Sequence, residues 1–141
     1  SMLCVEDYLV SLRWVQNMGG LAQVINRSKQ NLEIIMQWVS QTNWIDMLAK
    51  NSETISNTSI CLQIVDKKIS GLQESEQRSF IKEIVELLAL EGVAYDIEAY
   101  RSAPPGFRIW GGGTVESADI HYLCEWLDWA YQSVESRNFE T

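Results

Sequence analysis

The sequence predicts an α+β fold, in which a small, mostly antiparallel sheet of three strands carries helices on one face. Three observations support this prediction. The chain has 141 residues, of which 46% are hydrophobic, so it is long enough to bury the core of one domain. Segments with apolar residues three and four positions apart predict helices, and shorter alternating segments predict strands. Their order is helix, helix, strand, helix, strand, strand, helix.

Two helices are expected at the start of the chain. Residues 5–18 carry an apolar stripe, and a pair of glycines ends it. Residues 21–41 repeat apolar positions over a longer stretch. This helix pair is long for so small a sheet. We therefore expect residues 1–41 to be connecting helices, which join the α+β layer of residues 42–136 to a further domain.

The first strand and the third helix are expected in the middle of the chain. Residues 42–57 have no clear period and read as irregular or briefly extended. In residues 58–66, Ile, Leu and Val alternate with other residues, which is typical of a strand with one buried face. Ser75 is a suitable N-cap for a helix that runs to residue 91.

Two more strands and a last helix complete the predicted layer. Residues 93–100 alternate again, and are expected to place Tyr95 and Ile97 on one face. Residues 107–110 read as a short strand. The last helix is expected to start at the N-cap Ser117 and to direct an apolar stripe inward.

The composition excludes several classes of function. The net charge is −8, with a sequence pI near 4.6, which argues against binding to nucleic acid or to an anionic membrane. No apolar run is long enough to span a bilayer, and the acidic start does not resemble a secretory signal, so we expect a cytoplasmic protein. Cys4, Cys61 and Cys124 are interpreted as reduced core thiols. With one histidine in the chain, no metal site is expected.

The stretch "YRSAPPGFRIWGGGTVE" is the main candidate for a binding site. Pro105 and Gly106 suit the middle of a type II turn, so Arg101 and Arg108 are expected at the mouth of a hairpin. Two guanidinium groups there could hold a carboxylate or a phosphate. The alternative is that both arginines are surface residues paired with acids, of which the chain has nineteen. The "GGGT" run reads as a tight turn, or as a place where another group approaches the backbone closely.

Other candidates for chemistry are weaker. His121 belongs to no constellation of an acid with a Ser or Cys at a recognisable spacing, so a surface or packing role is expected. Trp126 and Trp129 flank the apolar stripe of the last helix and are interpreted as packing or interface residues. The lysines all lie in polar surroundings, which does not favour a Schiff-base lysine. No catalytic residue is therefore predicted within this chain.

Two of these motifs resemble a known family. "AYRSAPPGFRIWGGGTVESADI" and "WLDWAY" are similar to the C-terminal end of phosphoserine aminotransferases, and "SNTSICLQIVD" and "EGVAYDIEAYR" extend the likeness over nearly the whole chain. The family consists of pyridoxal-phosphate enzymes of fold type I, class V. They work as homodimers and transfer an amino group between glutamate and 3-phosphohydroxypyruvate, which gives O-phosphoserine in L-serine biosynthesis.

The resemblance implies that residues 1–141 form the small, substrate-binding domain of such an enzyme. A large domain, with the Schiff-base lysine and the pyridoxal phosphate, would precede Ser1. The chain by itself is then expected to be inactive and to bind no cofactor. The resemblance also implies that Arg108 holds the substrate carboxylate and that Arg101 contacts the substrate phosphate, although Tyr100 stands where other branches have a histidine. Two alternatives remain: a free-standing module that binds small anions or a partner, and the small domain of another fold type I aminotransferase.

Overall fold

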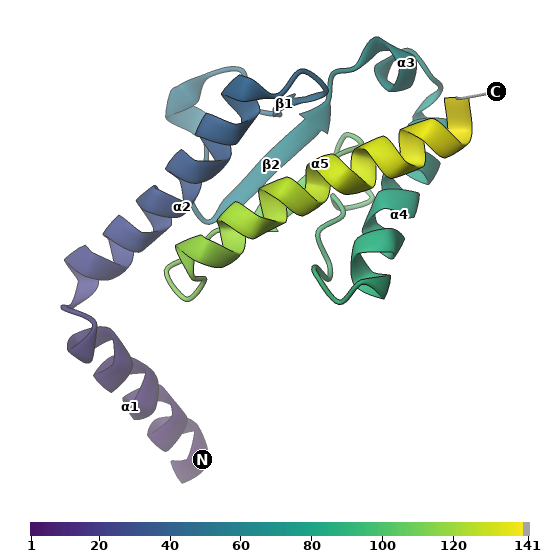
Figure 1. Ribbon diagram of the computed structural model, residues 1–141. Coiled ribbons are helices and arrows are strands. Elements are labelled where there is room, and N and C mark those ends of the chain that lie inside the picture. Colours follow the sequence, from purple (N-terminus) through teal and green to yellow (C-terminus); the bar gives the residue numbers. More distant parts are fainter. Residues whose placement is uncertain (140–141) are drawn as a thin grey trace.

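The protein is described by a computed structural model that covers residues 1–139. A short 3-10 turn, Ser52–Thr54, precedes the second strand. Figure 1 shows the helices and strands in chain order: α1 (Met2–Asn17), α2 (Leu21–Gln41), β1 (Ile45–Met47), β2 (Ser59–Ile64), α3 (Lys67–Ser70), α4 (Glu74–Leu90), β3 (Phe107–Trp110) and α5 (Ser117–Phe139).

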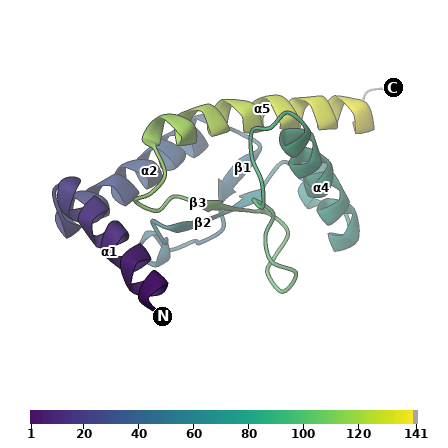
Figure 2. The same ribbon diagram turned by 90° about the horizontal axis from the view of Figure 1, so that it is seen from below.

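The three strands form one antiparallel sheet in the order β1–β2–β3. Helix α5 packs against both α2 and α4, and Figure 2 shows these three helices on the same side of the sheet. The predicted α+β class, with three strands and helices on one face, is confirmed. No helix within residues 1–139 is long and apolar enough to cross a membrane.

The core lies between the sheet and the helices. Strand β2 buries Ile60, Leu62 and Ile64 and leaves its alternate residues half-buried, as predicted. Helix α5 buries six side chains: Ile120, Cys124, Leu127, Ala130, Tyr131 and Val134. The apolar stripe predicted for the last helix is therefore confirmed.

Polar contacts to α5 fix the aromatic part of this core. The Asp128 carboxylate accepts the indole N–H of Trp38 at 2.8 Å and that of Trp44 at 2.7 Å. The Trp44 ring stacks on Tyr131 with centroids 4.2 Å apart, and the Tyr131 hydroxyl donates to Asp66 at 2.6 Å. This hydrogen bond lowers the pKa of Asp66, and burial raises the pKa of Tyr131. Asp128 and Tyr131 of the "WLDWAY" motif thus stabilise the packing of the core.

One predicted strand is wrong. Residues 93–100 form no regular strand, and the third strand of the sheet is β1, within the segment read as briefly extended. Asp96 has φ +55°, so the chain turns away from β3 there. Pairing persists only beyond it, where the Arg108 N–H donates to the Ile97 carbonyl at 2.8 Å. Tyr95 is exposed while Ile97 is buried, so these two do not share a face.

The predicted helix boundaries need corrections. Helix α1 runs over Met2–Asn17 rather than over residues 5–18, and Ser117 is the first residue of α5 rather than its N-cap, with its hydroxyl donating to Oδ1 of Asn31 at 2.8 Å. The predicted bounds of α2 are confirmed, whereas Ser75 is not the N-cap of α4. That position belongs to Gln73, whose N–H donates to the Glu76 carboxylate at 3.0 Å. The side chain that returns to the helix start is therefore an acid in the first turn, as in a capping box.

Helix α1 differs from the other long helices because it buries no side chain. Most of its apolar residues remain exposed, and among them Leu12 is 46% exposed, while Leu9 and Val15 are half-buried. Gly19 and Gly20, both with positive φ, separate α1 from α2. In Figure 1, α1 projects away from the layer.

Candidate functional site

Arg108 lies on the face of the sheet opposite the helices. In β3, Phe107 and Ile109 are buried in the core, so Arg108 points the other way, as predicted. Its side chain is 17% exposed. The guanidinium carbon lies 4.5 Å from the centroid of the Tyr100 ring, a cation–π contact. One nitrogen, Nη2, lies 3.5 Å from Oδ2 of Asp96. A half-buried arginine is thus held in one orientation at the surface.

One donor of this arginine has no partner. Arg108 Nε is buried and makes no hydrogen bond within residues 1–139. Buried donors in folded proteins are nearly always satisfied by protein or by water. A ligand carboxylate that pairs with Nη2 would approach this donor as well, and a shift of the side chain would open Nε for a bidentate pair. The geometry therefore suits a ligand anion at Arg108.

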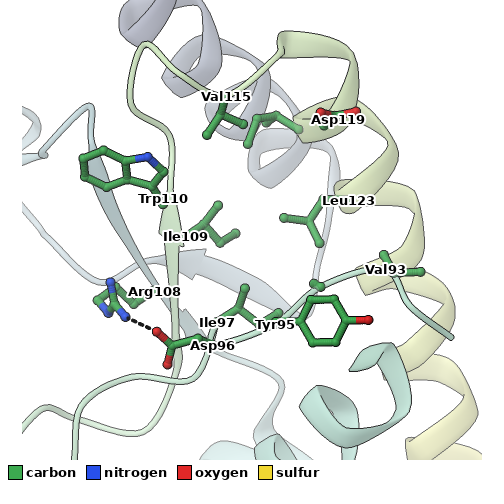
Figure 3. A pocket seen from close by; sticks show the side chains of 12 residues that line it. Val93, Tyr95, Asp96, Ile97, Arg108, Ile109, Trp110, Val115, Asp119 and Leu123 are labelled. Carbon is green, nitrogen blue, oxygen red and sulfur yellow. Dashed lines mark hydrogen bonds and ion pairs between the residues drawn. The ribbon is translucent and has the colours of Figure 1, made fainter. Parts of the chain in front are cut away.

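A pocket of about 350 Å³ opens beside Arg108. Figure 3 shows its walls, which come from β3, from the segment before Ile97, and from the start of α5. The pocket exists because the chain leaves β3 at Asp96, so no neighbouring strand fills the space beside Trp110. Its walls are mostly apolar, and Asp96, Arg108 and Asp119 supply the charged groups. This composition, apolar with a few converging polar groups, is typical of small-molecule sites.

The turn between the two arginines is not where the sequence placed it. The tight turn spans Tyr100 to Ala103, whose N–H donates to the Tyr100 carbonyl at 2.9 Å. Gly106 does not have the positive φ that a type II turn requires. It is needed for another reason. A Cβ at Gly106 would lie 2.0 Å from the Leu62 carbonyl oxygen, so only glycine allows β2 to approach this closely.

Arg101 has different surroundings from Arg108. Its residue is exposed and does not line the pocket beside Arg108. Within the described chain, its guanidinium makes no hydrogen bond or ion pair, while its carbonyl accepts from Arg78 at 3.4 Å. Arg78 also donates to the Ala103 carbonyl at 2.7 Å and pairs with Glu74. Sequence reasoning missed Arg78, which ties this turn to α4.

The glycine run is a tightly packed turn against α2. A Cβ at Gly113 would lie 2.5 Å from Cγ1 of Val24. Asn31, fully buried on α2, donates to the carbonyls of Gly111 and Val115 at 3.1 Å each. Arg27 donates through Nε to the Gly113 carbonyl at 2.8 Å. The close approach expected at "GGGT" is therefore that of another part of the same chain.

The weaker candidates lie apart from Arg108. His121 is exposed on α5, 3.6 Å from Glu125. Trp126 and Trp129 pack edge to face with centroids 5.1 Å apart. In residues 1–139, no three His, Cys, Asp or Glu side chains are placed to hold a metal ion.

The cysteines divide into three environments. Cys124 is buried, and burial followed by the charges of Asp128 and Glu125 raises the pKa of its thiol to about 12. Cys61 is half-buried. Cys4 is exposed on α1, and Cys61 lies on the face of β2 that points away from the core, so the prediction that all three are core thiols holds only for Cys124. The position of Cys4 looked buried because α1 has an apolar stripe that nothing covers in this structure.

Comparison with known proteins identifies relatives of this chain. It is 43% identical over 135 residues to the phosphoserine aminotransferase of Methanosarcina mazei, and 42% identical over 135 residues to that of Methanosarcina barkeri. In both cases the match covers 96% of this chain. The resemblance to phosphoserine aminotransferases is confirmed.

The match covers 34% of each of these aminotransferases, so the chain spans about a third of the length of the curated relatives it matches. Solved phosphoserine aminotransferases share its fold. The enzyme from Bacillus circulans subsp. alkalophilus superposes with a TM-score of 0.68 at 17% identity, over 86% of this chain and 30% of the other. A second structure, of radiation damage to the Schiff base in phosphoserine aminotransferase, gives 0.67 at 13% identity, over 86% and 30%. No protein-family model matches the chain.

Proposed function

We propose that this chain is the substrate-binding small domain of a phosphoserine transaminase. The observation that carries the proposal is the 42–43% identity to phosphoserine aminotransferases over 96% of the chain, together with a half-buried arginine that has an unsatisfied donor beside a pocket. In the complete enzyme, an amino group passes between glutamate and 3-phosphohydroxypyruvate to make O-phosphoserine for L-serine biosynthesis in the cytoplasm.

Arg108 binds and orients the substrate carboxylate in this proposal. Its guanidinium is already fixed by Tyr100 and by the β3 backbone, so little conformational entropy is lost when the carboxylate binds. Arg101 is the contact for the substrate phosphate. Its exposed guanidinium, which forms no ion pair with residues 1–139, can reach a ligand without breaking one of the described pairs.

The cofactor belongs to the other part of the enzyme. Pyridoxal phosphate supplies the electron sink for transamination when it is bound. The pocket beside Arg108 has no lysine among its lining residues, which does not suit a Schiff base there. We therefore assign the cofactor and the catalytic lysine to a large domain, and no cofactor contact to this chain.

The exposed side of α1 supports a partner domain. Val5, Tyr8 and Leu12 are 57%, 66% and 46% exposed on a helix that buries nothing. Apolar surface of this kind usually packs against something. In the proposal, α1 contacts the large domain, and two such chains form the homodimer.

The test is Arg108→Ala in the full-length protein. Loss of the partner for a desolvated carboxylate is expected to cost about 2–5 kcal/mol in kcat/KM, for glutamate and for O-phosphoserine alike. Steady-state transamination with both substrates measures it. Arg101→Ala is the matched control, and it should weaken only the phosphorylated substrate. Unchanged turnover of both substrates by Arg108→Ala would contradict the proposal.

A further inference from the structure

Asp96 and Arg108 form an uneven ion pair at the edge of the pocket (Figure 3). A single contact joins them, Nη2 to Oδ2 at 3.5 Å. The Arg108 side chain is 17% exposed, whereas that of Asp96 is 92% exposed. Water therefore screens the acid strongly, and an exposed pair with one long contact adds little to stability. The acid can leave the arginine at small cost.

Arg108 does not depend on Asp96 for its position. The ring of Tyr100 covers the guanidinium, and the Arg108 N–H donates to the Ile97 carbonyl at 2.8 Å. On its other side, Arg108 is paired with Cys61 of β2 in the sheet register. The backbone of Arg108 is thus held by the neighbouring segments, and its guanidinium is held by the Tyr100 ring. An effect of Asp96 should therefore fall on whatever else approaches the guanidinium.

We infer that Asp96 is an internal competitor for the anion that binds Arg108. Its carboxylate occupies Nη2 while the site is empty, and a ligand carboxylate displaces it in order to reach this nitrogen. Asp96 thereby weakens the affinity of the site for anionic ligands. This inference rests on the proposed role of Arg108 as the carboxylate-binding residue.

The backbone at Asp96 makes a clean test possible. Within residues 1–139, Asp96 is the one non-glycine residue with positive φ, at +55°. Asparagine and glycine both tolerate this left-handed conformation. Asp96→Asn and Asp96→Gly therefore remove the carboxylate and keep the path of the chain. Two variants of different size separate the effect of charge from that of packing.

The experiment measures the dissociation constant of L-glutamate by calorimetry with the full-length protein. We expect Asp96→Asn and Asp96→Gly to lower it by about twofold to fivefold, the range that exposed ion pairs span. Glu98→Gln is the matched control. It removes a carboxylate from the same segment that has no ion pair with Arg108, and it should leave the constant unchanged. An unchanged or raised constant in Asp96→Asn would overturn the inference.

Arg108→Ala separates this inference from the proposed function. In that background, Asp96→Asn should have no effect, because the two residues act on the same nitrogen. If Arg108→Ala leaves glutamate binding unchanged, the proposed function fails. If Arg108→Ala weakens binding and Asp96→Asn does not tighten it, only the inference about Asp96 fails.

Discussion

Helices α1 and α5 have similar apolar content and opposite relations to the rest of the molecule. Helix α5 buries six side chains between the sheet, α2 and α4, and its Asp128 binds two tryptophans of other segments. Helix α1 buries none and leaves apolar residues such as Val5 and Leu12 in solvent. An apolar period therefore predicts a helix, but it does not tell which surface will cover that helix.

The difference shows which part of the chain is self-sufficient. The elements from α2 to α5 form one core, whereas α1 buries no side chain against residues 1–139. Under the proposed function, α1 contacts the larger domain. The following changes test the contrast between the two helices, from the largest expected effect to the smallest.

The same substitution in the two helices should have very different costs. Leu127→Ala in α5 removes a fully buried side chain and should lower the free energy of unfolding by about 2–5 kcal/mol. Leu12→Ala in α1, at a residue 46% exposed, should change it by less than about 0.5 kcal/mol. Urea unfolding of this chain measures both. Equal costs would mean that α1 packs on the layer after all.

The polar anchor of α5 gives a second comparison. Asp128→Asn replaces one of two acceptor oxygens by an amide that cannot accept, so one indole N–H loses its partner. The expected loss is about 1–3 kcal/mol in unfolding free energy. Asp7→Asn is the control on α1, where the carboxylate makes no hydrogen bond with the described residues, and no loss is expected. A shift in tryptophan fluorescence should accompany Asp128→Asn only.

The thiols of the two helices should differ in their effect on pH dependence. The pKa of Cys124 is raised to about 12 in the folded chain, so folding keeps a proton that the unfolded thiol loses. This contribution to stability is complete below the unfolded pKa, near pH 8.5, and is lost as the pH rises above it. Between about pH 8 and pH 10, Cys124→Ala should therefore lose less free energy of unfolding than the parent chain does. Cys4→Ala, at an exposed site, should follow the parent curve.

Deletion of residues 1–18 should also have a small effect, and it is the most direct test of the contrast. Because α1 buries no side chain, the free energy of unfolding should change by less than about 1 kcal/mol. The shortened chain should also associate less at high concentration, since exposed apolar residues are removed. Light scattering and urea unfolding measure these two properties. A loss of cooperative unfolding would show that α1 belongs to the core.

Long periodic segments made the fold class predictable. The exact bounds of α2 and the buried face of β2 followed from spacing, because each contains several repeats of its period. Strand β1 has only three residues, too few for alternation to register. Residues 93–100 alternate in sequence, yet the left-handed backbone at Asp96 directs the chain away from β3. The pattern of side chains in this segment does not predict that change of direction.

The candidate site was predictable in part for the same reason. Alternation in β3 placed Arg108 on the face opposite the core, and the structure agrees. Its neighbours Tyr100 and Asp96 depend on how the irregular segment returns to β3, which is a tertiary property. Gly106 was recognised as necessary, but for a positive φ rather than for its approach to Leu62. Turn propensity therefore identified Gly106, but it did not predict the close contact with β2 that requires a glycine there.

The attachment of the glycine run to α2 has a mechanical consequence. Asn31 and Arg27 donate to the carbonyls that follow β3, so hydrogen bonds couple α2 to the end of the strand that bears Arg108. Gly19 and Gly20, both with positive φ, join the N-terminal end of α2, which lies on the same half of the helix as these contacts, to α1. A tilt of α2 about this glycine joint therefore carries the guanidinium with it. The orientation of one helix sets the position of the charge that meets the ligand.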